Sequence, residues 1–349
     1  MGAVPVRVAR IPLLARLFPE APRDTLGPVQ SEKKKPPVDR LIWRDGELVP
    51  WEQATVHLLS HSLQRGSLVF DYMSVHETPK GPAVFRMDLH IRRMLRSCQL
   101  MDLPIRLAAD EIGEAIKAAV RANPGAKAVK ACAFFGSVEV DVVPIDDRVS
   151  VAIAAYDPVR DIVERLPGER KPRRATLRLW LEKRAHQRRE DIVSPHAKVS
   201  ANYASSMTAK ARALREGYDE ILLVDEDGFV AEGPTSNVFL VDPAGALLTP
   251  NEQRVLEGVT RQSIIELAKA DGFPVREEPI RPEQLFDARE VFLTGTTAGV
   301  LPVESVDGRA IGERCPGPVA EALLAHFKRV VAGQDPAFDH WLAYVGARA

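Results

Sequence analysis

The chain has 349 residues, of which 45% are hydrophobic and 27% are charged, and its formal net charge at pH 7 is -1. This length suits two domains of ordinary size, and this composition can bury a sizeable core. A net charge near zero excludes a global field that favours nucleic acid or an anionic membrane.

The cysteines and the apolar runs bear on the compartment. Cys98, Cys132 and Cys315 lack metal-ligand spacing, and their odd number argues against a disulfide framework. No apolar run approaches the roughly 18 residues of a membrane-spanning helix. We therefore predict a reducing, cytoplasmic compartment. The basic, partly apolar residues 1–24 lack a signal-peptide core with a cleavage site, so we interpret them as an extension, with a targeting segment as the alternative.

The front of the chain predicts an extension followed by an α+β domain. Residues 1–38 end in a Gly, Pro and Lys-rich stretch that is typical of a solvated linker. Two short apolar runs around Asp45-Gly46 predict a hairpin. The further elements expected in the domain at 39–157 are strands at 68–78, 83–86, 129–143 and 148–156 and helices at 88–101 and 109–122.

A polar, Pro-bearing segment at 158–174 is predicted to be the interdomain loop, and residues 175–349 the larger second domain. The elements expected there are a strand at 175–181, hairpins at 220–232 and 237–250, a strand at 289–295, and helices at 203–216, 260–270 and 319–332.

Four stretches of the second domain carry reactive or polar residues whose chemical roles complement one another. Lys198 lies in AKVSANY and Glu232 in VAEGPTSNVFLV, while Thr260 opens a helix in LEGVTRQ and Thr296 and Thr297 follow a strand in VFLTGTTAGVLPV. An amine shielded by apolar neighbours attacks an aldehyde, a carboxylate keeps a ring nitrogen protonated, and a helix N-terminus favours an anion. Together these groups are what a phosphorylated aldehyde cofactor requires.

This set resembles the fold-type IV pyridoxal phosphate (PLP) enzymes, and most closely the branched-chain amino acid aminotransferase group. The resemblance covers about residues 40–313, including VFRMDLHIRRML and VESVDGRAIG. It implies a two-domain α+β fold like that of D-amino acid aminotransferase, with a small α+β domain, a larger barrel-like sheet domain with helices, and PLP between them. It also implies a homodimer, and an interdomain loop that borders the active site.

The resemblance assigns roles residue by residue. It implies that Lys198 forms the Schiff base with PLP and then moves the Cα proton of the substrate. The residues implied to bind the cofactor are Arg86, Tyr203, Glu232, Leu256, Val259, Thr260, Gly295 and Thr296. Arg86 matches the phosphate-binding arginine, Glu232 the partner of the ring nitrogen. Thr260 also suits a plain helix N-cap, and Tyr203 and Leu256 also suit ordinary core positions.

The sequence departs from the family where substrate is bound. The family shows HYG before VFEG, whereas Arg65 stands here in place of the tyrosine and Tyr72 in place of the second glycine. Cys132 stands where a substrate-binding arginine is expected. We predict a substrate pocket formed by Arg65, Phe70, Tyr72, Thr297 and Ala298. Tyr72 is expected to narrow it, and Arg65 either pairs a substrate carboxylate or lies on the surface.

These observations favour a transaminase that moves an amino group from a branched-chain-like amino acid to a 2-oxo acid. A D-amino acid or (R)-amine transaminase stays open because the substrate residues are unusual, and TTAGVLPV also suits an aminodeoxychorismate lyase-like enzyme. A binding protein that has lost its chemistry is disfavoured, because the reactive residues are all present. The sequence shows no metal-binding histidine pair, no GxSxG and no dinucleotide fingerprint.

Overall fold

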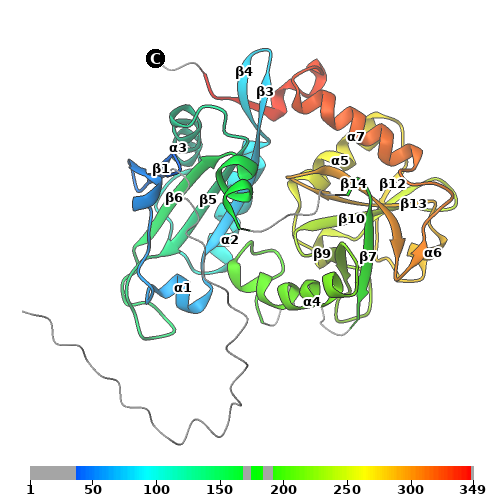
Figure 1. Ribbon diagram of the computed structural model, residues 1–349, viewed down its shortest axis with the longest axis horizontal. Coiled ribbons are helices and arrows are strands. Elements are labelled where there is room, and N and C mark those ends of the chain that lie inside the picture. Colours follow the sequence, from blue (N-terminus) through cyan, green and yellow to red (C-terminus); the bar gives the residue numbers. More distant parts are fainter. Residues whose placement is uncertain (1–36, 168–173, 184–191, 347–349) are drawn as a thin grey trace, which may run out of the picture. The chain divides into compact units, whose positions relative to one another are not determined.

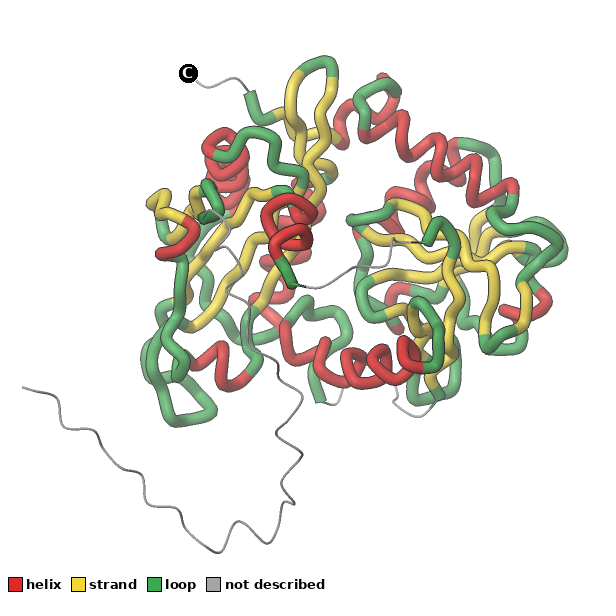
Figure 2. Tube along the Cα trace, in the orientation of Figure 1, coloured by secondary structure: helices red, strands yellow, loops and turns green. Residues whose placement is uncertain are grey.

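A computed structural model describes residues 37–167, 174–183 and 192–346 (Figure 1). The chain divides into two units, Met1–Pro37 and Val38–Ala349. The predicted extension and linker at 1–38 lie almost entirely outside the described residues. The strands of the second unit form two separate sheets (Figure 2).

The first sheet is antiparallel throughout and has the strand order β16-β4-β3-β5-β6-β1-β2. Its strands are β1 (Leu41–Arg44), β2 (Glu47–Pro50), β3 (Val69–Thr78), β4 (Gly81–Phe85), β5 (Ala128–Phe135), β6 (Val149–Tyr156) and β16 (Leu342–Tyr344). Helices α2 (Met87–Leu100) and α3 (Ala109–Ala122) share a core with one face of this sheet. Because side chains alternate along a strand, the opposite face is left for other contacts.

Strand β3 shows this alternation clearly. Val69, Asp71 and Met73 are fully buried on the helix side, whereas Phe70 and Tyr72 between them are partly exposed on the other side. One face of β3 therefore packs in the core, and its other face lines a cavity.

The second sheet is mixed and follows the path β12-β11-β10-β13-β14-β7-β8, with β9 beside β10 and β15 beside β14. Its strands are β7 (Leu177–Glu182), β8 (Glu220–Leu223), β9 (Glu232–Gly233), β10 (Ser236–Val241), β11 (Leu247–Thr249), β12 (Val275–Glu277), β13 (Glu290–Gly295), β14 (Gly299–Val306) and β15 (Arg309–Ala310).

Both faces of this second sheet are covered. Helices α5 (Val259–Ala270) and α7 (Pro318–Val331) lie together on one side (Figure 1), and α6 (Gln284–Asp287) contributes to a second core on the other side. Strands buried on both faces carry continuous apolar runs, as in NVFLV and EVFL. The second core unites side chains of β7 and β14 with those of β10 and β13, so the sheet curls around it. The predicted α+β class with a barrel-like second sheet is confirmed.

Most predicted elements are present within one or two residues of their expected ends. The predicted hairpins at 41–51 and 237–250 are β1–β2 and β10–β11. The helix predicted at 203–216 begins as a 3-10 turn, η5 (Ser200–Tyr203), and continues as α4 (Ala204–Arg215).

Two strand predictions are wrong in extent. The strand expected at 129–143 ends at Phe135 as β5, because its neighbours β3 and β6 supply no partner beyond that point. The valines that follow are exposed, and of these Val138 makes a single isolated bridge with Ser60. The hairpin expected at 220–232 is reduced to one bridge between Val224 and Val230, and Glu232 pairs with β10 in β9.

Several elements lie outside the sequence-based expectation, including α6, β12, β14 and β15 of the second sheet region. A short helix, α1 (His61–Arg65), precedes β3, and the C-terminal strand β16 pairs with β4 of the first sheet. The domain limits at 39–157, 158–174 and 175–349 stay a prediction. Strand β16, near the end of the chain, returns to pair with β4 of the first sheet.

Candidate active site

The segment that carries Lys198 is held against the edge of β3 by backbone hydrogen bonds. The amide of Phe70 donates to the carbonyl of Lys198 at 3.0 Å, and the amide of Ser200 donates to the carbonyl of Leu68 at 2.9 Å. The Lys198 amide also donates to Oγ of Ser97 on α2 at 3.0 Å. The lysine therefore belongs to the second half of the sequence but is positioned by the first sheet.

The Lys198 side chain is enclosed by two aromatic residues. Its Nζ donates a hydrogen bond to the Tyr203 hydroxyl at 3.1 Å and lies 5.2 Å from the centroid of the Phe70 ring. The rings of Phe70 and Tyr203 are themselves 5.3 Å apart. This contact fixes the direction in which the amine points.

Lys198 opens into a small cavity whose lining contains almost the whole predicted cofactor set. The lining residues are Arg93, Lys198, Tyr203, Glu232, Thr235, Ser236, Asn237, Leu256, Gly258, Val259, Thr260, Thr294, Gly295 and Thr296. The structure thus brings together every predicted cofactor residue except Arg86.

Glu232 is held in this cavity as an oriented carboxylate. It is only 3% exposed, and it accepts hydrogen bonds from Nδ2 of Asn237 at 3.1 Å and from the amide of Leu256 at 3.3 Å. Its place in the short strand β9 beside β10 sets the distance to Asn237. A fixed buried carboxylate of this kind suits a protonated ring nitrogen.

The other end of the cavity offers donors to an anion. Helix α5 begins at Val259, so the unpaired amides of its first turn and its dipole face the cavity beside Thr260. The hydroxyl of Thr294 is buried without a hydrogen-bond partner. Gly258 permits the tight packing here, since a Cβ at that position would lie 1.9 Å from Oδ1 of Asn237. Orphaned donors and a backbone cradle fit a phosphorylated ligand.

Arg86, which the resemblance implies to be the phosphate-binding arginine, is not among the residues that line this cavity. Its guanidinium lies 4.4 Å from the centroid of the Trp341 ring and pairs with Glu266 at 3.1 Å. Trp341 precedes β16, so Arg86 is drawn to the returning C-terminal segment, which the sequence pattern did not anticipate.

Arg93 is the arginine that lines the cavity, and sequence reasoning missed it. It lies two helical turns after Arg86 on α2, within the buried stripe His90, Arg93 and Ser97. The helical spacing of VFRMDLHIRRML places Arg93 on the apolar face of the helix, and this was the signal available. An arginine on such a face is rarely buried without a partner, so its position indicates a bound or paired group.

Asp71 is that partner. The Arg93 Nε donates to Oδ2 of Asp71 at 2.9 Å and its Nη2 to Oδ1 at 2.8 Å, while Nδ1 of His90 lies 2.7 Å from Oδ1. A third bond runs from Nη1 of Arg93 to the carbonyl of Glu257 at 2.9 Å. Burial by itself raises the pKa of Asp71, but the charges of Arg93 and His90 outweigh it and hold the pKa well below its usual range.

A larger cavity of about 710 Å³ adjoins Lys198 and contains most of the predicted substrate residues. Phe70, Tyr72, Thr297 and Ala298 line it, whereas Arg65 does not. Arg65 is exposed, and its Nη2 donates to the carbonyl of Val140 at 2.9 Å, so the surface alternative holds for this residue. Burial and neighbouring Tyr156 raise the pKa of Tyr72 to about 12, against an opposing hydrogen bond with Thr297, and Tyr72 is therefore neutral at pH 7.

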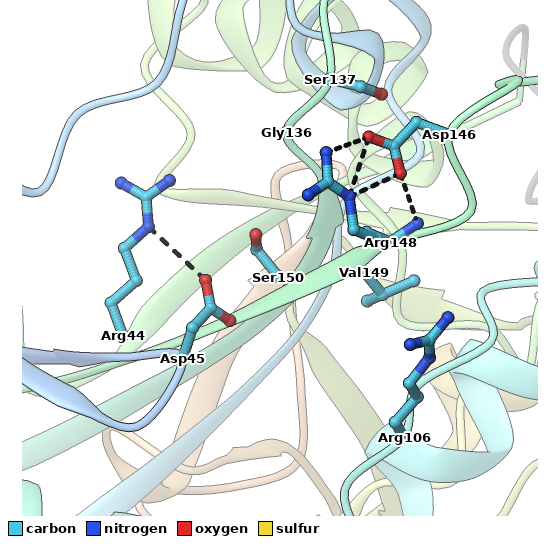
Figure 3. A pocket seen from close by; sticks show the side chains of 9 residues that line it. All are labelled: Arg44, Asp45, Arg106, Gly136, Ser137, Asp146, Arg148, Val149 and Ser150. Atoms are coloured by element: carbon cyan, nitrogen blue, oxygen red, sulfur yellow. Dashed lines mark hydrogen bonds and ion pairs between the residues drawn. The ribbon is translucent and has the colours of Figure 1, made fainter.

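A third cavity, of about 510 Å³, contains none of the predicted residues (Figure 3). Three arginines line it, and each has an aspartate partner: Arg44 with Asp45 at 3.8 Å, Arg106 with Asp147 at 3.6 Å and Arg148 with Asp146 at 2.6 Å. These exposed pairs neutralise one another, so the cavity lacks the uncompensated charge of a binding site.

Two negative findings apply to the described residues alone. Within 37–167, 174–183 and 192–346, no group of three or more His, Cys, Asp or Glu side chains is arranged to hold a metal ion. Within the same ranges, no helix is long and apolar enough to cross a membrane.

Comparison with known proteins gives a consistent result. A model of the amino-transferase class IV family matches residues 68–306. The branched-chain-amino-acid aminotransferase of Pseudomonas aeruginosa is 36% identical over 308 residues, which cover 88% of this chain and 98% of that protein. The Escherichia coli K12 enzyme of the same name is 34% identical over 314 residues, covering 87% and 97%.

Solved structures agree with this match. The T.th. branched-chain amino acid aminotransferase complexed with N-(5'-phosphopyridoxyl)-L-glutamate has a TM-score of 0.80 and 36% identity, covering 89% of this chain and 100% of that one. The Escherichia coli branched-chain amino acid aminotransferase has a TM-score of 0.80 and 33% identity, covering 88% and 100%.

The Asp71 cluster gives a test of stability against pH. Asp71→Asn leaves the buried Arg93 charge uncompensated, so we expect a loss of about 3–5 kcal/mol in unfolding free energy at pH 7. The folded pKa of Asp71 lies below the ordinary value of 3.8, so its ionised form stabilises the fold above that pH and the contribution is lost as the pH falls through the folded value. Urea unfolding between pH 7 and pH 3 measures the difference at pH 7 and the beginning of the loss below the ordinary value of 3.8.

Asp102→Asn is the matched control for Asp71→Asn, because Asp102 is exposed at the end of α2. The control should unfold like the parent at every pH. An Asp71→Asn protein as stable as the parent at pH 7 would contradict the role given to the cluster.

Proposed function

The chain belongs to the class IV aminotransferases, and from this premise we propose that it moves the amino group of a branched-chain or related amino acid to a 2-oxo acid, using PLP bound beside Lys198. The observation that carries the proposal is the junction of the two cavities. They share the lining residues Lys198, Tyr203, Thr235, Ser236, Gly295 and Thr296. A cofactor in the small cavity is thereby exposed to a substrate in the large one.

The cofactor, when bound, supplies an electron sink for the electron pair left at Cα after proton removal. We propose that Lys198 holds it and then carries the Cα proton, since its amine is the basic group at the junction. The Tyr203 hydroxyl accepts a hydrogen bond from this amine and orients it. Glu232, fixed by Asn237, is placed to keep the ring nitrogen protonated.

The phosphate end is assigned to backbone and side-chain donors. The first turn of α5 at Val259 and Thr260 and the β13–β14 turn at Gly295 and Thr296 offer amides and hydroxyls. Arg93 adds a guanidinium that Asp71 holds in place. Leu256 provides an apolar contact for a ring face.

The names of the relatives support a branched-chain donor, because the matched proteins from several bacteria are branched-chain-amino-acid aminotransferases. Phe70, Tyr72, Thr297 and Ala298 are the proposed substrate contacts, and the bulk of Tyr72 narrows the cavity compared with a glycine. The alternatives to this proposal are a D-amino acid donor, an (R)-amine donor and lyase activity.

A homodimer is the proposed assembly. The loop between β5 and β6 exposes a run of apolar side chains, and α1 and the residues before it expose more. The apolar residues that are at least 49% exposed there are Leu58, Leu59, Leu63, Val138, Val140, Val142, Val143 and Ile145. An apolar patch of this kind typically marks a protein contact, and a second copy of this chain is its proposed occupant.

A reducing, cytoplasmic location is also proposed. Its support is that Cys98, Cys132 and Cys315 are all free thiols. Burial raises the pKa of Cys98 to about 12 and that of Cys132 to about 11, so these two thiols are poorly reactive.

The absorbance of the purified protein tests the activity. We expect a visible band from bound PLP that leucine, isoleucine or valine shifts to that of the amine form of the cofactor, and that 2-oxoglutarate restores. Lys198→Ala should lose the visible band, whereas Lys117→Ala should keep it, because the Lys117 side chain lies on α3, is 27% exposed and pairs with Glu114. Conversion by D-amino acids or (R)-1-phenylethylamine alone would replace the branched-chain donor, and a band that no donor converts would favour a lyase.

The roles of the two arginines are tested by cofactor affinity. Arg93→Gln should raise the Kd of the apoprotein for PLP by about 10- to 100-fold, because it removes a charge-assisted contact to phosphate. The same substitution should leave the Kd for pyridoxal, which lacks the phosphate, nearly unchanged. Arg86→Gln should leave both values near those of the parent. Fluorescence titration measures them, and the reverse pattern would restore Arg86 as the phosphate ligand.

The proposed dimer is tested by the mass of the protein in solution. Val140 is 94% exposed, so Val140→Asp should fold normally and shift the protein from dimer towards monomer. Met207→Asp, at an exposed apolar residue of α4, is the control and should stay dimeric. Light scattering across a dilution series reports both, and a parent protein that is monomeric throughout would refute the assembly.

A further inference from the structure

Ser97 is a buried serine of α2 that the proposed function does not use. Its side chain is fully buried, about one turn of the helix after Arg93. Its Oγ donates a hydrogen bond to the carbonyl of Arg93 at 2.8 Å and accepts one from the amide of Lys198 at 3.0 Å. A single hydroxyl group therefore joins the backbone of the reactive lysine to the backbone of the arginine that lines the cofactor cavity.

The chemistry of the three groups determines the direction of both hydrogen bonds. A backbone N–H can only donate and a backbone carbonyl can only accept, so the hydroxyl proton of Ser97 goes to Arg93 and a lone pair of the same oxygen receives the Lys198 amide. Successive hydrogen bonds in a buried chain strengthen one another. An alanine at this position would provide neither bond.

The backbone of Lys198 is held from two sides by the first sheet and its helix. Its carbonyl accepts a hydrogen bond from the amide of Phe70 on β3 at 3.0 Å, while its amide is held by Ser97. The flanking residues Ala197 and Val199 are fully buried in the core that α2 shares with the sheet. The place of the Lys198 backbone relative to α2 is thereby fixed.

Helix α2 also anchors the other end of the cofactor cavity. Arg93 lines that cavity, and its guanidinium is held by Asp71 on β3 and by the carbonyl of Glu257, just before α5. A phosphorylated aldehyde reaches the Lys198 amine only if the separation between the phosphate donors and the lysine matches its length. Ser97 is the contact that connects these two anchors directly.

We propose that Ser97 is a positioning residue that sets the place of Lys198 relative to a cofactor whose phosphate lies beside Arg93. This inference rests on the proposed function and deepens it. Without the Ser97 hydroxyl, the buried amide of Lys198 loses its partner, and the segment shifts to find another. Because an amine must approach an aldehyde closely to react with it, such a shift slows the reaction while the phosphate contacts remain.

The test uses two forms of the cofactor that differ in their ability to react with lysine. Pyridoxamine 5'-phosphate carries the ring and the phosphate but no aldehyde, so its Kd for the apoprotein reports the noncovalent contacts alone. PLP carries the aldehyde, and the rate at which its visible band appears after mixing with the apoprotein reports the approach of the Lys198 amine.

Ser97→Ala should slow the appearance of the band by about 10- to 100-fold, because a small displacement of a reacting group costs this much. The same substitution should leave the Kd for pyridoxamine 5'-phosphate nearly unchanged. Ser97→Thr, which keeps the hydroxyl, should restore most of the rate. If Ser97→Ala fails to fold, Ser97→Cys preserves the volume with a weaker acceptor and is measured in the same way.

Ser62→Ala is the matched control. Ser62 is also buried, and its Oγ accepts a hydrogen bond from the amide of Phe135 at 2.9 Å. Its side-chain partners in the described part of the chain are Phe135 and Ser67, neither of which lines the two cavities that share Lys198. Both alanine variants should lose stability in urea, but Ser62→Ala should form the visible band at the parent rate.

Two results would overturn the inference. One is a Ser97→Ala protein that forms the band as fast as the parent. The other is a Ser97→Ala protein whose Kd for pyridoxamine 5'-phosphate rises by the same factor as the rate falls, since the serine would then act on the cavity as a whole.

Failure of the proposed function gives a different pattern, because the parent itself would then form no visible band. Hydrogen exchange of the Lys198 amide, measured by mass spectrometry, still reports on Ser97 in that case. Exchange should be faster in Ser97→Ala than in the parent or in Ser62→Ala, and equal exchange in all three proteins would contradict the role given to Ser97.

Discussion

The alternation of β3 is the constraint on which the site depends. Its edge holds the Lys198 segment through backbone hydrogen bonds, which fixes where the reactive amine emerges. Its inward residue Asp71 holds Arg93 towards the cofactor cavity, and its outward residues Phe70 and Tyr72 line the substrate cavity. A shift of one residue in the register of this strand would exchange these two faces and dismantle both cavities at once.

Charge in the site is controlled by burial combined with partners. Asp71 is fully buried yet ionised, because two cationic or hydrogen-bonding side chains from one face of α2 surround it. Glu232 is buried and oriented by an amide and a backbone N–H. The hydroxyl groups of the substrate cavity stay neutral instead, since burial raises the pKa of Tyr72 and Tyr156 without a nearby cation strong enough to reverse it. The result is a cavity whose walls are neutral apart from its lysines, Arg174 and the acids that pair with Arg174 and Lys210.

The sequence predicted the parts of the site that depend on local motifs. Lys198, Glu232, Thr260 and Thr296 each sit at the start or end of an element that the hydrophobic pattern also predicted, and the structure gathers all four. The sequence could not show which of Arg86 and Arg93 lines the cavity. Arg86 is held elsewhere by Trp341, a residue near the far end of the chain whose position no local motif predicts. Likewise, the direction of Arg65 is set by the carbonyl of Val140, a contact between a helix and a loop 75 residues later.

The strand predicted at 129–143 ends at Phe135, and the residues beyond it are informative because their sequence pattern and their exposure disagree. Val138, Val140 and Val142 alternate with acidic residues as in a half-buried strand, but no neighbouring strand reaches them and they remain 58%, 94% and 72% exposed. Full burial of such a side chain contributes roughly 1.5 kcal/mol or more, and each of these valines forgoes the part of it that corresponds to its exposed fraction. A loop whose sequence alternates as in a buried strand, but which the chain itself leaves exposed, is the physical basis for the dimer proposed above. The same loop accepts the Arg65 hydrogen bond, so in the proposed dimer this arginine lies beside the second copy.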